Sequence, residues 1–530
     1  MAVRIGVFGW GLVAPKSPNI EAFRANLETS ETWLAPFNGF GPDNFLVGTP
    51  SFQFEDYREW IDQRFAPRHY QNLKEKMDLP TLYALGGFIQ ALQQNPGMEE
   101  ELKRLGSQAH VYVGTGLGSI NTTYEASIAL YEAQKRWDRF WSSPERNAEL
   151  RAYLQQAPAD RDSSAPPQPE ETADEEARTR AEETWNRYWM SRSPELREYL
   201  DELATIDDLG IEGGIEAGKL NAIREKEKRR AKLQDKWQAP EPPWKVSANF
   251  VWNIHNTPAA QISILGKITG LSFAPVAACS TFGVSLGLAM RAIRSGEAKV
   301  VVVGATDPPP HPLTVGSFYS GRVLSSSRTV STPLTRLQGT HVAGGAVIWI
   351  VGDMEYLTSR GFQPVGMEPV AVGMSSDAHH IITPTAEGPR AAMVQALGEA
   401  GASPEAVGTW DLHATATPGD YSEVVTLRSV LSSSVVVTAR KGAFGHGMSA
   451  GGGWELTAQY LGYEQGKLFA TPLAEKELNA SIARVHDSFV FDSPREFPPG
   501  LGGKLSMGIG GVNACVISNP LTKQQRETGK

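Results

Sequence analysis

The chain has 530 residues, of which 41% are hydrophobic and 21% are charged, and its formal net charge at pH 7 is −9. This length suffices for one large core or two closely packed ones, and the composition is ordinary for a soluble globular protein. The negative charge argues against a general nucleic-acid-binding protein, which is normally basic. Two widely separated cysteines without a Cys-x-x-Cys pair exclude a disulfide framework and a cysteine-rich zinc site, and they favour a reducing compartment.

The N-terminal stretch MAVRIGVFGWGLVAPKS contains a short apolar run that Gly, Trp and Pro interrupt. It predicts a buried strand and a turn, because a secretory signal needs a longer apolar region and a cleavage site of small residues. No run of the sequence approaches the ~20 apolar residues of a membrane-spanning helix. We therefore expect a cytoplasmic protein without a membrane span.

Short runs rich in Val and Ile and bounded by glycine are typical of strands that are buried on both faces. Helical patterns lie between these runs, and the alternation predicts an α/β architecture with parallel or mixed sheets. The strand runs cover residues 4–11, 109–119, 298–306, 344–352, 408–417, 434–442 and 505–518, and the helical patterns include 283–294, 389–401 and 453–465.

Residues from about 120 to 243 interrupt this alternation. Residues 157–183 form a Pro-, Ser- and acid-rich linker without core residues, and residues 224–237 predict a charge-dense helix. One pattern occurs on both sides of the linker, as RWDRFWSSPERNAELRAYL (136–154) and TWNRYWMSRSPELREYL (184–200). Each copy predicts an amphipathic helical hairpin. The Trp faces of these hairpins either pack on each other or on the rest of the protein, or they form a docking surface for a partner subunit or carrier.

The segment PVAACSTFGVSLGLAM (275–290) places Cys279 directly before an apolar helix pattern. The positive end of a helix dipole favours a thiolate, and the small residues after Cys279 would let a substrate approach closely. The alternative is that Cys279 is a small buried apolar residue, as we expect of Cys515 in the strand pattern VNACVIS. This segment alone leaves both interpretations open.

Two histidines lie in similar surroundings. WDLHATATPGD (410–420) ends a strand pattern at His413, and RKGAFGHGMSAGGGWE (440–455) places His446 five residues after Lys441. Histidines among glycines and other small residues suit a site where a ligand lies against the backbone. Together with the cysteine, they predict a site that combines a nucleophile with imidazole groups.

The chain resembles the β-ketoacyl synthases, the thiolase-fold condensing enzymes of fatty acid and polyketide biosynthesis, in four segments that keep the family's order and similar separations. These segments are AACST, HATATPGD, KGAFGHGMSAGGGWE and GIGGVN, and two further stretches, GMSSDAHHIITP (373–384) and VGTGLGS (113–119), are also similar. The resemblance covers nearly the whole chain except the insertion at about 120–243, and it implies an elongating but atypical member.

The resemblance implies a five-layer αβαβα thiolase-like fold of two similar halves. The N-terminal half, residues 1–357, would carry Cys279 and the mainly helical insertion. The C-terminal half, residues 358–530, would carry His413 and His446, so that the site lies where the halves meet.

The resemblance also implies roles for individual residues. Cys279 matches the nucleophile that accepts the acyl group, and His413 and His446 match the histidines that assist decarboxylation and stabilise the enolate. Lys441 and Glu455 match an ion pair that positions the second histidine.

Three further positions are implied with supporting roles. Asp420 matches an acidic residue that organises the site after the first histidine. Ile509 lies where many elongating members carry a gating Phe, and its amide would form the oxyanion hole with that of Cys279. Leu117 corresponds to a residue that lines the acyl pocket.

The chain departs from the family pattern at several positions. Ala414 replaces the usual Gly after the first histidine, Ile509 replaces Phe, and Val512 replaces the usual Thr. AGGAVIW (343–349) lacks the acidic residue of the family stretch, and the insertion falls where the family has its dimer-interface segment. These changes leave the Cys/His/His chemistry intact but leave the acyl primer and the chain-length range open.

The implied function is that of a β-ketoacyl-[acyl-carrier-protein] synthase. It would need no metal or redox cofactor, because the substrates are carried on the phosphopantetheine of acyl carrier protein or on CoA. The implied partners are acyl carrier protein and either a second copy or a ketosynthase-like subunit. Two alternatives remain open: a non-condensing ketosynthase-like partner subunit, and an acyltransferase that uses Cys279 without decarboxylation.

Overall fold

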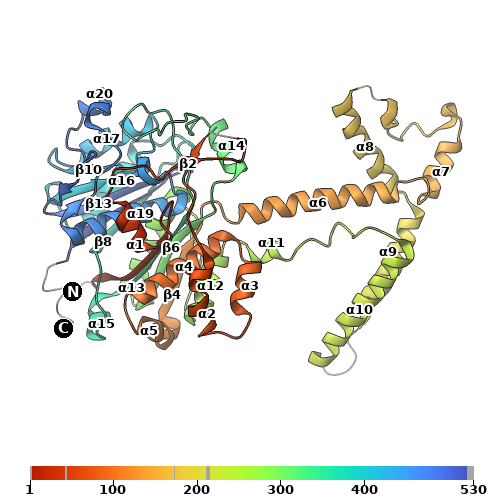
Figure 1. Ribbon diagram of the computed structural model, residues 1–530, viewed down its shortest axis with the longest axis horizontal. Helices are drawn as coiled ribbons and strands as arrows, with labels where there is room; N and C mark the ends of the chain where they lie inside the picture. The colour runs from red at the N-terminus through yellow and green to blue at the C-terminus, as the bar shows by residue number, and fades with distance from the viewer. Residues whose placement is uncertain (1–2, 42–44, 172–173, 211–214, 522–530) are drawn as a thin grey trace. The chain divides into compact units, whose positions relative to one another are not determined.

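The computed structural model describes residues 3–41, 45–171, 174–210 and 215–521 (Figure 1). The chain divides into two compact units. Unit 1 comprises Met1–Thr122 and Val251–Lys530, and unit 2 comprises Thr123–Phe250. Among the helices in the described part of the chain, none is long and apolar enough to cross a membrane.

The first sheet of unit 1 has five strands in the order β1-β7-β6-β4-β5. β4 pairs in parallel with β5 and β6, whereas β7 pairs antiparallel with β6 and β1. All residues of the four long strands are buried, as their Val- and Ile-rich runs predict. The strands are β1 (Ile5–Val13), β4 (Ala109–Gly114), β5 (Ser272–Phe273), β6 (Val300–Asp307) and β7 (Gly345–Asp353).

The second sheet of unit 1 has the order β10-β9-β13-β14-β8. The expectation of one strand over 505–518 is wrong, because the chain reverses there between two antiparallel strands. Gly510 and Gly511 form the turn with φ of 93° and 74°, a region that favours glycine. The strands are β8 (Met367–Ser376), β9 (Val407–Asp411), β10 (Val436–Thr438), β13 (Leu501–Gly508) and β14 (Val512–Pro520).

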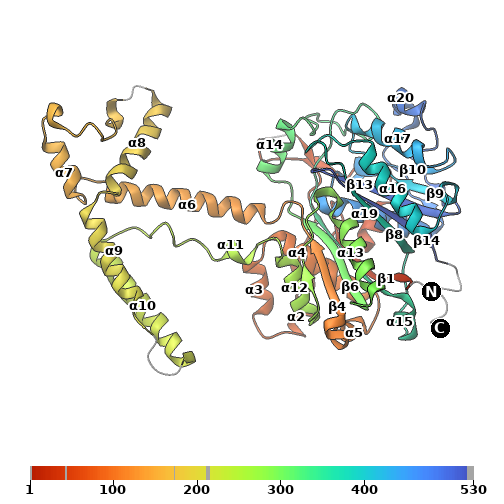
Figure 2. The ribbon, with the colours of Figure 1, turned by 180° about the vertical axis from the view of Figure 1, so that it is seen from behind.

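Helices cover both sheets and fill the space between them, which confirms the αβαβα order of layers (Figures 1 and 2). The central layer is α13 (Thr281–Ser295) and α19 (Met448–Gln465), which contact each other and strands of both sheets. Large side chains such as Phe282, Trp349 and Trp454 fill the core around these two helices. The outer layers are α4 (Leu79–Gln93) and α12 (Thr257–Gly266) on the first sheet, and α16 (Glu387–Ala400) with α17 (Gly419–Val430) on the second.

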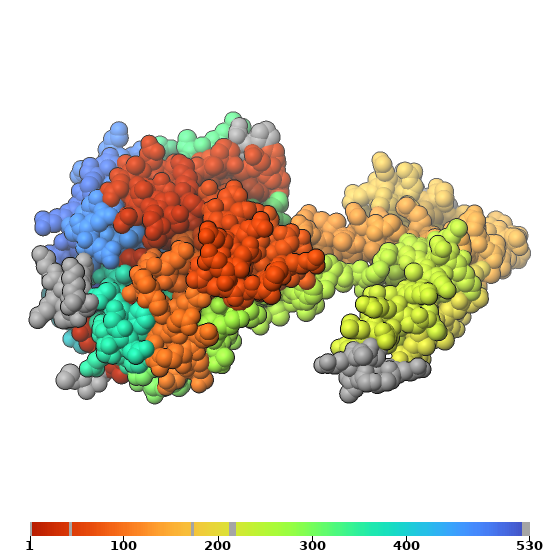
Figure 3. Space-filling view, turned by 60° about the horizontal axis from the view of Figure 1, so that its bottom comes forward, coloured from red at the N-terminus to blue at the C-terminus, as the bar shows by residue number. Residues whose placement is uncertain are grey.

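The remaining elements of unit 1 are short and join distant parts of the chain. Figure 3 shows N-terminal residues in red beside C-terminal residues in blue on one face of this unit. Trp33 N–H donates to the Ala443 carbonyl at 2.7 Å, and Lys467 pairs with Glu28 at 2.6 Å. These elements are α1 (Ile20–Asn26), β2 (Ala35–Pro36), β3 (Leu46–Val47), α2 (Arg58–Asp62), α3 (His69–Lys76), α5 (Met98–Leu105), α11 (Asn249–Trp252, at the unit boundary), α14 (Pro312–Ser320), α15 (Met354–Ser359), α18 (Lys441–Phe444), β11 (Lys467–Leu468), α20 (Ala480–Ala483) and β12 (Arg495–Glu496).

Unit 2 contains helices and no strand within the residues that the structure describes. The linker expected over 157–183 is shorter than predicted, because its last residues form the first turns of α8. Asp174 caps that helix by accepting a hydrogen bond from the Ala177 N–H, and two glutamates follow in the first turn, where the helix dipole favours them. The helices are α6 (Ile120–Trp141), α7 (Ala148–Gln155), α8 (Glu175–Met190), α9 (Pro194–Asp207) and α10 (Ile215–Trp237).

The two sequence repeats of unit 2 pack against each other. The Trp pair of each copy lies on the second helix of the other copy. The ring centroids of Trp141 in α6 and Tyr199 in α9 are 5.4 Å apart, and those of Trp189 in α8 and Tyr153 in α7 are 4.8 Å apart. The Trp face of each copy therefore packs on the other copy, and because both faces are buried they do not form the docking surface considered above. The buried members of the two clusters are Trp137, Trp141, Leu196, Tyr199, Leu233 and Ala239 in one, and Leu150, Trp185 and Trp189 in the other.

Candidate active site

Cys279 lies in a single 3-10 turn, Ala278–Ser280, immediately before α13. The preceding residue, Ala278, has a φ of 47°, in the left-handed region that a residue with a Cβ rarely adopts. This strained turn places the thiol at the wall of a cavity of about 370 Å³. The cavity is lined by Cys279, Phe318, Arg322, Val323, Thr340, Ile382, Thr383, Pro384, His413, Ala414, Thr415, Thr417, Pro418, Gly419, Asp420, Ser422, Glu423, His446, Met507, Gly508 and Ile509.

The structure brings both predicted histidines to the same cavity. His446 lies between α18 and α19, and its Nε2 is 3.1 Å from the Cys279 Sγ. His413 follows the end of β9, and its ring centroid is 5.3 Å from that of His446 with the ring planes nearly perpendicular. Three residues from distant segments therefore converge on one space.

Burial keeps these three groups uncharged. It raises the pKa of the Cys279 thiol to about 11, although the positive charge of Lys441 acts in the opposite direction. Burial also lowers the pKa of His413 and of His446 well below the usual value, and nearby lysines lower both further. The backbone N–H group of Cys279 at the start of the helix lowers the pKa of the thiol, as expected of a helix N-terminus, but burial has the larger effect and raises it. The thiol needs a base, and His446 Nε2 is in contact with it.

The expected ion pair forms beside the histidines. Lys441 Nζ lies 2.6 Å from Glu455 Oε1, and both side chains are buried. The same ammonium donates a hydrogen bond to the carbonyl oxygen of His413. The pair thus contacts the backbone of the first histidine, whereas the resemblance assigned it to the second. Lys504, which the sequence did not single out, contacts the other oxygen of Glu455 at 2.7 Å.

Two carboxylates of α17 hold the loop that carries His413. Asp420 accepts hydrogen bonds from the N–H groups of Thr415 and Ala416, which fits the organising role that the resemblance implies. Glu423 accepts from the N–H groups of His413 and Ala414 at 2.6 and 2.8 Å, and burial raises its pKa to about 7. Sequence reasoning missed Glu423, although its place three residues after Asp420 at the start of a helix puts both on one helix face.

Asp307, a third carboxylate at the site and the second that sequence reasoning missed, ends β6 beneath the site. It accepts hydrogen bonds from the N–H groups of Leu117 at 2.7 Å and Ser449 at 2.8 Å, and so joins the turn after β4 to the start of α19. The only sequence signal was its place at the end of the run VVVVGATD. Leu117 packs in an apolar cluster with Phe318 and Met448. Of these three, Phe318 lines the cavity, whereas Leu117 is not among the described residues that do.

Ile509 lies at the cavity, just after β13, with its side chain 42% exposed. Its backbone N–H and that of Cys279 both interact with the Cys279 sulfur and lower the pKa of the thiol. These are the two N–H groups that the resemblance assigns to the oxyanion hole.

Comparisons with known proteins identify the family to which the chain is similar. The family "Beta-ketoacyl synthase, N-terminal domain" matches residues 204–353, and "Beta-ketoacyl synthase, C-terminal domain" matches residues 368–473. The 3-oxoacyl-[acyl-carrier-protein] synthase 2 of Staphylococcus aureus is 29% identical over 291 residues, which are 52% of this chain and 70% of that protein. The chloroplastic 3-oxoacyl-[acyl-carrier-protein] synthase I of Arabidopsis thaliana is 30% identical over 283 residues, which are 51% of this chain and 59% of that protein.

Solved structures show the same fold. The ishigamide ketosynthase/chain length factor matches with a TM-score of 0.67 and 17% identity, and a β-ketoacyl synthase from Burkholderia phymatum with 0.66 and 16%. Both matches cover 98% of this chain and 100% of the other. The chain belongs to the β-ketoacyl synthase family, whose members are acyltransferases that form carbon–carbon bonds.

Proposed function

We propose that the protein is a β-ketoacyl-[acyl-carrier-protein] synthase that loads an acyl group onto Cys279 and condenses it with a malonyl-carrier. The product is a chain two carbons longer. The observation that supports this function is the contact of Cys279 Sγ with His446 Nε2 in a cavity that also holds His413. A thiol is both a good nucleophile and a good leaving group, as thioester exchange requires.

In the first step, the sulfur of Cys279 attacks the carbonyl carbon of the acyl thioester while His446 Nε2 accepts the thiol proton. The N–H groups of Cys279 and Ile509 stabilise the oxyanion of the tetrahedral intermediate. When the intermediate collapses, the bond to the carrier sulfur breaks and that thiolate takes the proton from His446. The acyl group remains on Cys279 as a thioester.

In the second step, the malonyl thioester loses CO2, and the electron pair of the broken carbon–carbon bond forms an enolate. The N–H group of the His413 imidazole donates a hydrogen bond to the enolate oxygen, and His446 does so once exchange with solvent has moved its ring proton to Nε2; neutral rings in a buried site stabilise the enolate without reorganisation. The enolate carbon attacks the Cys279 thioester, a carbon–carbon bond forms, and the carbon–sulfur bond breaks. The Cys279 thiolate then takes up a proton from solvent, which replaces the one that left with the carrier thiol in the first step.

The substrates of these steps arrive on the phosphopantetheine of acyl carrier protein or on CoA, and no step uses a metal or a redox group. A solved structure titled as a type II PKS acyl-carrier protein in complex with its ketosynthase, 16% identical with a TM-score of 0.63, supports a carrier as partner. We propose either a homodimer or a heterodimer with a ketosynthase-like subunit, and a cytoplasmic location, which the two free cysteines favour.

We also propose that the two halves are residues 1–357, with Cys279, and 358–530, with both histidines. The order of the strands along the chain supports this boundary. All strands of the first five-stranded sheet, up to β7, precede residue 357, and all strands of the second, from β8 on, follow it.

Mass spectrometry of the full chain after incubation with acyl-CoA or acyl-carrier tests the function. We expect an acyl group on the peptide that contains Cys279, and then CO2 and a 3-oxoacyl product when malonyl-carrier is added. Cys279→Ala should prevent loading and reduce condensation by about three orders of magnitude or more. Cys515→Ala is the matched control, because Cys515 is buried within β14, and it should keep both activities.

Full condensation by the Cys279→Ala variant would contradict the proposal. Product without release of CO2 would instead indicate an acyltransferase. Turnover only with a stoichiometric partner, together with no acyl group on Cys279, would indicate a non-condensing subunit.

A further inference from the structure

Lys504 is a second buried lysine beneath the histidines. It lies on β13, with its side chain 1% exposed, and its Nζ is 2.7 Å from Glu455 Oε2. The same ammonium donates hydrogen bonds to the carbonyl oxygens of Leu412, at 3.2 Å, and Leu505, at 2.5 Å. A charge so deeply buried needs several partners to offset its lost hydration, and Lys504 has three.

Lys504 and Lys441 share the carboxylate of Glu455, and each also holds one backbone carbonyl at or just before His413. Glu455 contacts Lys441 with Oε1 and Lys504 with Oε2. Lys441 donates to the carbonyl of His413, and Lys504 donates to the carbonyl of Leu412, the preceding residue. The carboxylate of Glu423 accepts the N–H of His413. The backbone around the first histidine is therefore fixed by two cations and one anion.

The charge of Lys504 acts on this loop more than on the nucleophile. Of the charged groups that face Glu423, Lys504 and Lys441 lower its pKa and Asp420 raises it, with Lys504 the largest of the three. Lys504 also lowers the pKa of His413, together with Lys441 and His446, and it lowers the pKa of His446 less than Lys441 does. The charged groups that shift the pKa of Cys279 are Lys441 and Asp307.

We propose that Lys504 is a positioning residue for His413, which holds the Leu412 carbonyl and supplies, beside Lys441, the second positive charge that the buried carboxylates of Glu423 and Glu455 require. The inference rests on the proposed function, since it assigns Lys504 to the decarboxylation step. Loading of Cys279 does not depend on His413 in that function. Loss of Lys504 should therefore affect decarboxylation and leave acyl loading nearly unchanged.

The test compares Lys504→Met with the wild-type full chain in two assays between pH 5.5 and 8.5. The first measures release of CO2 from malonyl-carrier, and the second measures acylation of Cys279 by acyl-CoA. In the wild type, decarboxylation should fall on the acidic side as Glu423 takes up a proton near pH 7. Removing a nearby cation raises the pKa of a carboxyl group, so the acidic limb should move up by about one pH unit in the variant. Acyl loading should stay within about twofold.

Arg440→Met is the matched control, because Arg440 is an equally buried cation that pairs instead with Asp411, at 3.0 Å. It should lose stability without moving the acidic limb. Lys504→Gln, which keeps a donor for the Leu412 carbonyl but removes the charge, replaces Lys504→Met if the latter does not fold. An acidic limb at the wild-type pH in the folded Lys504 variant would overturn the inference. A wild-type protein that never loads Cys279 would instead overturn the proposed function, and this inference with it.

Discussion

The two units of the chain place their charged side chains in opposite ways. In unit 1, the side chains of Lys441, Glu455 and Lys504 are at most 2% exposed and lie beneath the histidines. In unit 2, the pair Arg139–Glu182 joins side chains that are 66% and 45% exposed, and its two partners come from α6 and α8.

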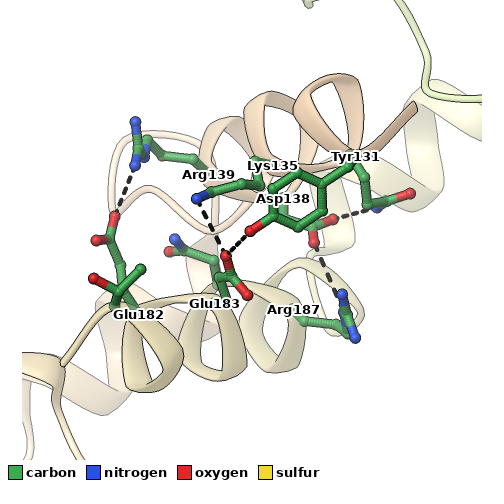
Figure 4. A pocket seen from close by; sticks show the side chains of 10 residues that line it. Tyr131, Lys135, Asp138, Arg139, Glu182, Glu183 and Arg187 are labelled. Atoms are coloured by element: carbon green, nitrogen blue, oxygen red, sulfur yellow. Dashed lines mark hydrogen bonds and ion pairs between the residues drawn. The ribbon is translucent and has the colours of Figure 1, made fainter. Parts of the chain in front are cut away.

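Figure 4 shows this arrangement in the narrow cleft between α6 and α8. Tyr131 and Lys135 of α6 both contact the carboxylate of Glu183 in α8, and Arg187 of α8 lies 3.9 Å from Asp138 of α6. Asp138 is the buried exception, at 5% exposure, and burial raises the pKa of its carboxyl group.

The difference between buried charges in unit 1 and exposed charges in unit 2 has an energetic reason. Burying an ion pair costs several kcal/mol of desolvation, which good geometry only partly offsets, whereas an exposed pair contributes about 0–1 kcal/mol. Unit 2 therefore holds its helices together with buried aromatic rings and keeps most charges in water. Unit 1 buries charged side chains against the backbone of a residue that we assign to chemistry, and it also buries the pair Arg440–Asp411, which we do not assign to that role.

The largest expected effect of burial in unit 1 is on the reactivity of the Cys279 thiol. Because the thiolate is the nucleophile and the pKa of the thiol is about 11, alkylation by iodoacetamide should accelerate about tenfold per pH unit from pH 7 to 9.5. Mass spectrometry of the Cys279 peptide measures the rate, and Cys279→Ala gives the background. A rate that reaches a plateau below pH 8.5 would show a thiolate stabilised by the helix N-terminus.

Glu455→Gln should have the next largest effect, because it leaves Lys441 and Lys504 buried without their shared carboxylate. We expect the free energy of unfolding of unit 1 to fall by about 3–5 kcal/mol. Hydrogen exchange of α19 peptides in increasing urea measures this loss. If the loss is below about 1 kcal/mol, the buried pair behaves like a surface pair and the contrast between the units does not hold.

Trp141→Ala should destabilise unit 2 by about 3–5 kcal/mol, since a fully buried indole is replaced by a cavity. Limited proteolysis within residues 123–250 and hydrogen exchange of α9 peptides measure the effect. Trp244→Ala is the control, because that side chain is 55% exposed. Equal loss of protection in α13 of unit 1 would show that the units do not unfold separately.

Arg139→Ala should have the smallest effect. It removes an exposed ion pair with Glu182, so the free energy of unfolding of unit 2 should change by less than about 1 kcal/mol and less still at high salt. Urea unfolding followed by hydrogen exchange of α8 peptides at two salt concentrations measures the change. A loss of unfolding free energy comparable to that of Trp141→Ala would show that the ion pairs between α6 and α8, and not the aromatic clusters, stabilise unit 2.

Local sequence predicted much of the site because its main groups lie in short segments of unusual composition. Cys279 stands between small residues and an apolar helix pattern, and His413 and His446 stand among glycines and other small residues. The contact of Cys279 with His446 could be inferred only through the family resemblance. Neither segment contains information about the distance between atoms that are 167 residues apart in the chain.

In unit 2, too, the sequence predicted the local elements but not the contacts between them. The repeated Trp and Leu-x-x-Tyr pattern determined that two helical hairpins form, because each helix has one apolar face. The pattern could not tell whether the Trp pair of a copy packs within its own hairpin or on the other copy. The packing of the four helices is what places Trp141 on Tyr199 and Trp189 on Tyr153, each in the other copy.

The sequence by itself predicted the α/β architecture from periodicity, and the family resemblance of short segments predicted the family and a nucleophile, Cys279, with two histidines. Only the tertiary structure showed that Glu423 and Lys504 hold the His413 loop and that burial raises the pKa of the Cys279 thiol. The physical reason is that both properties depend on burial and on contacts across β9, β13 and α17. Burial sets the pKa of each group, and no local pattern measures how much water the folded chain excludes.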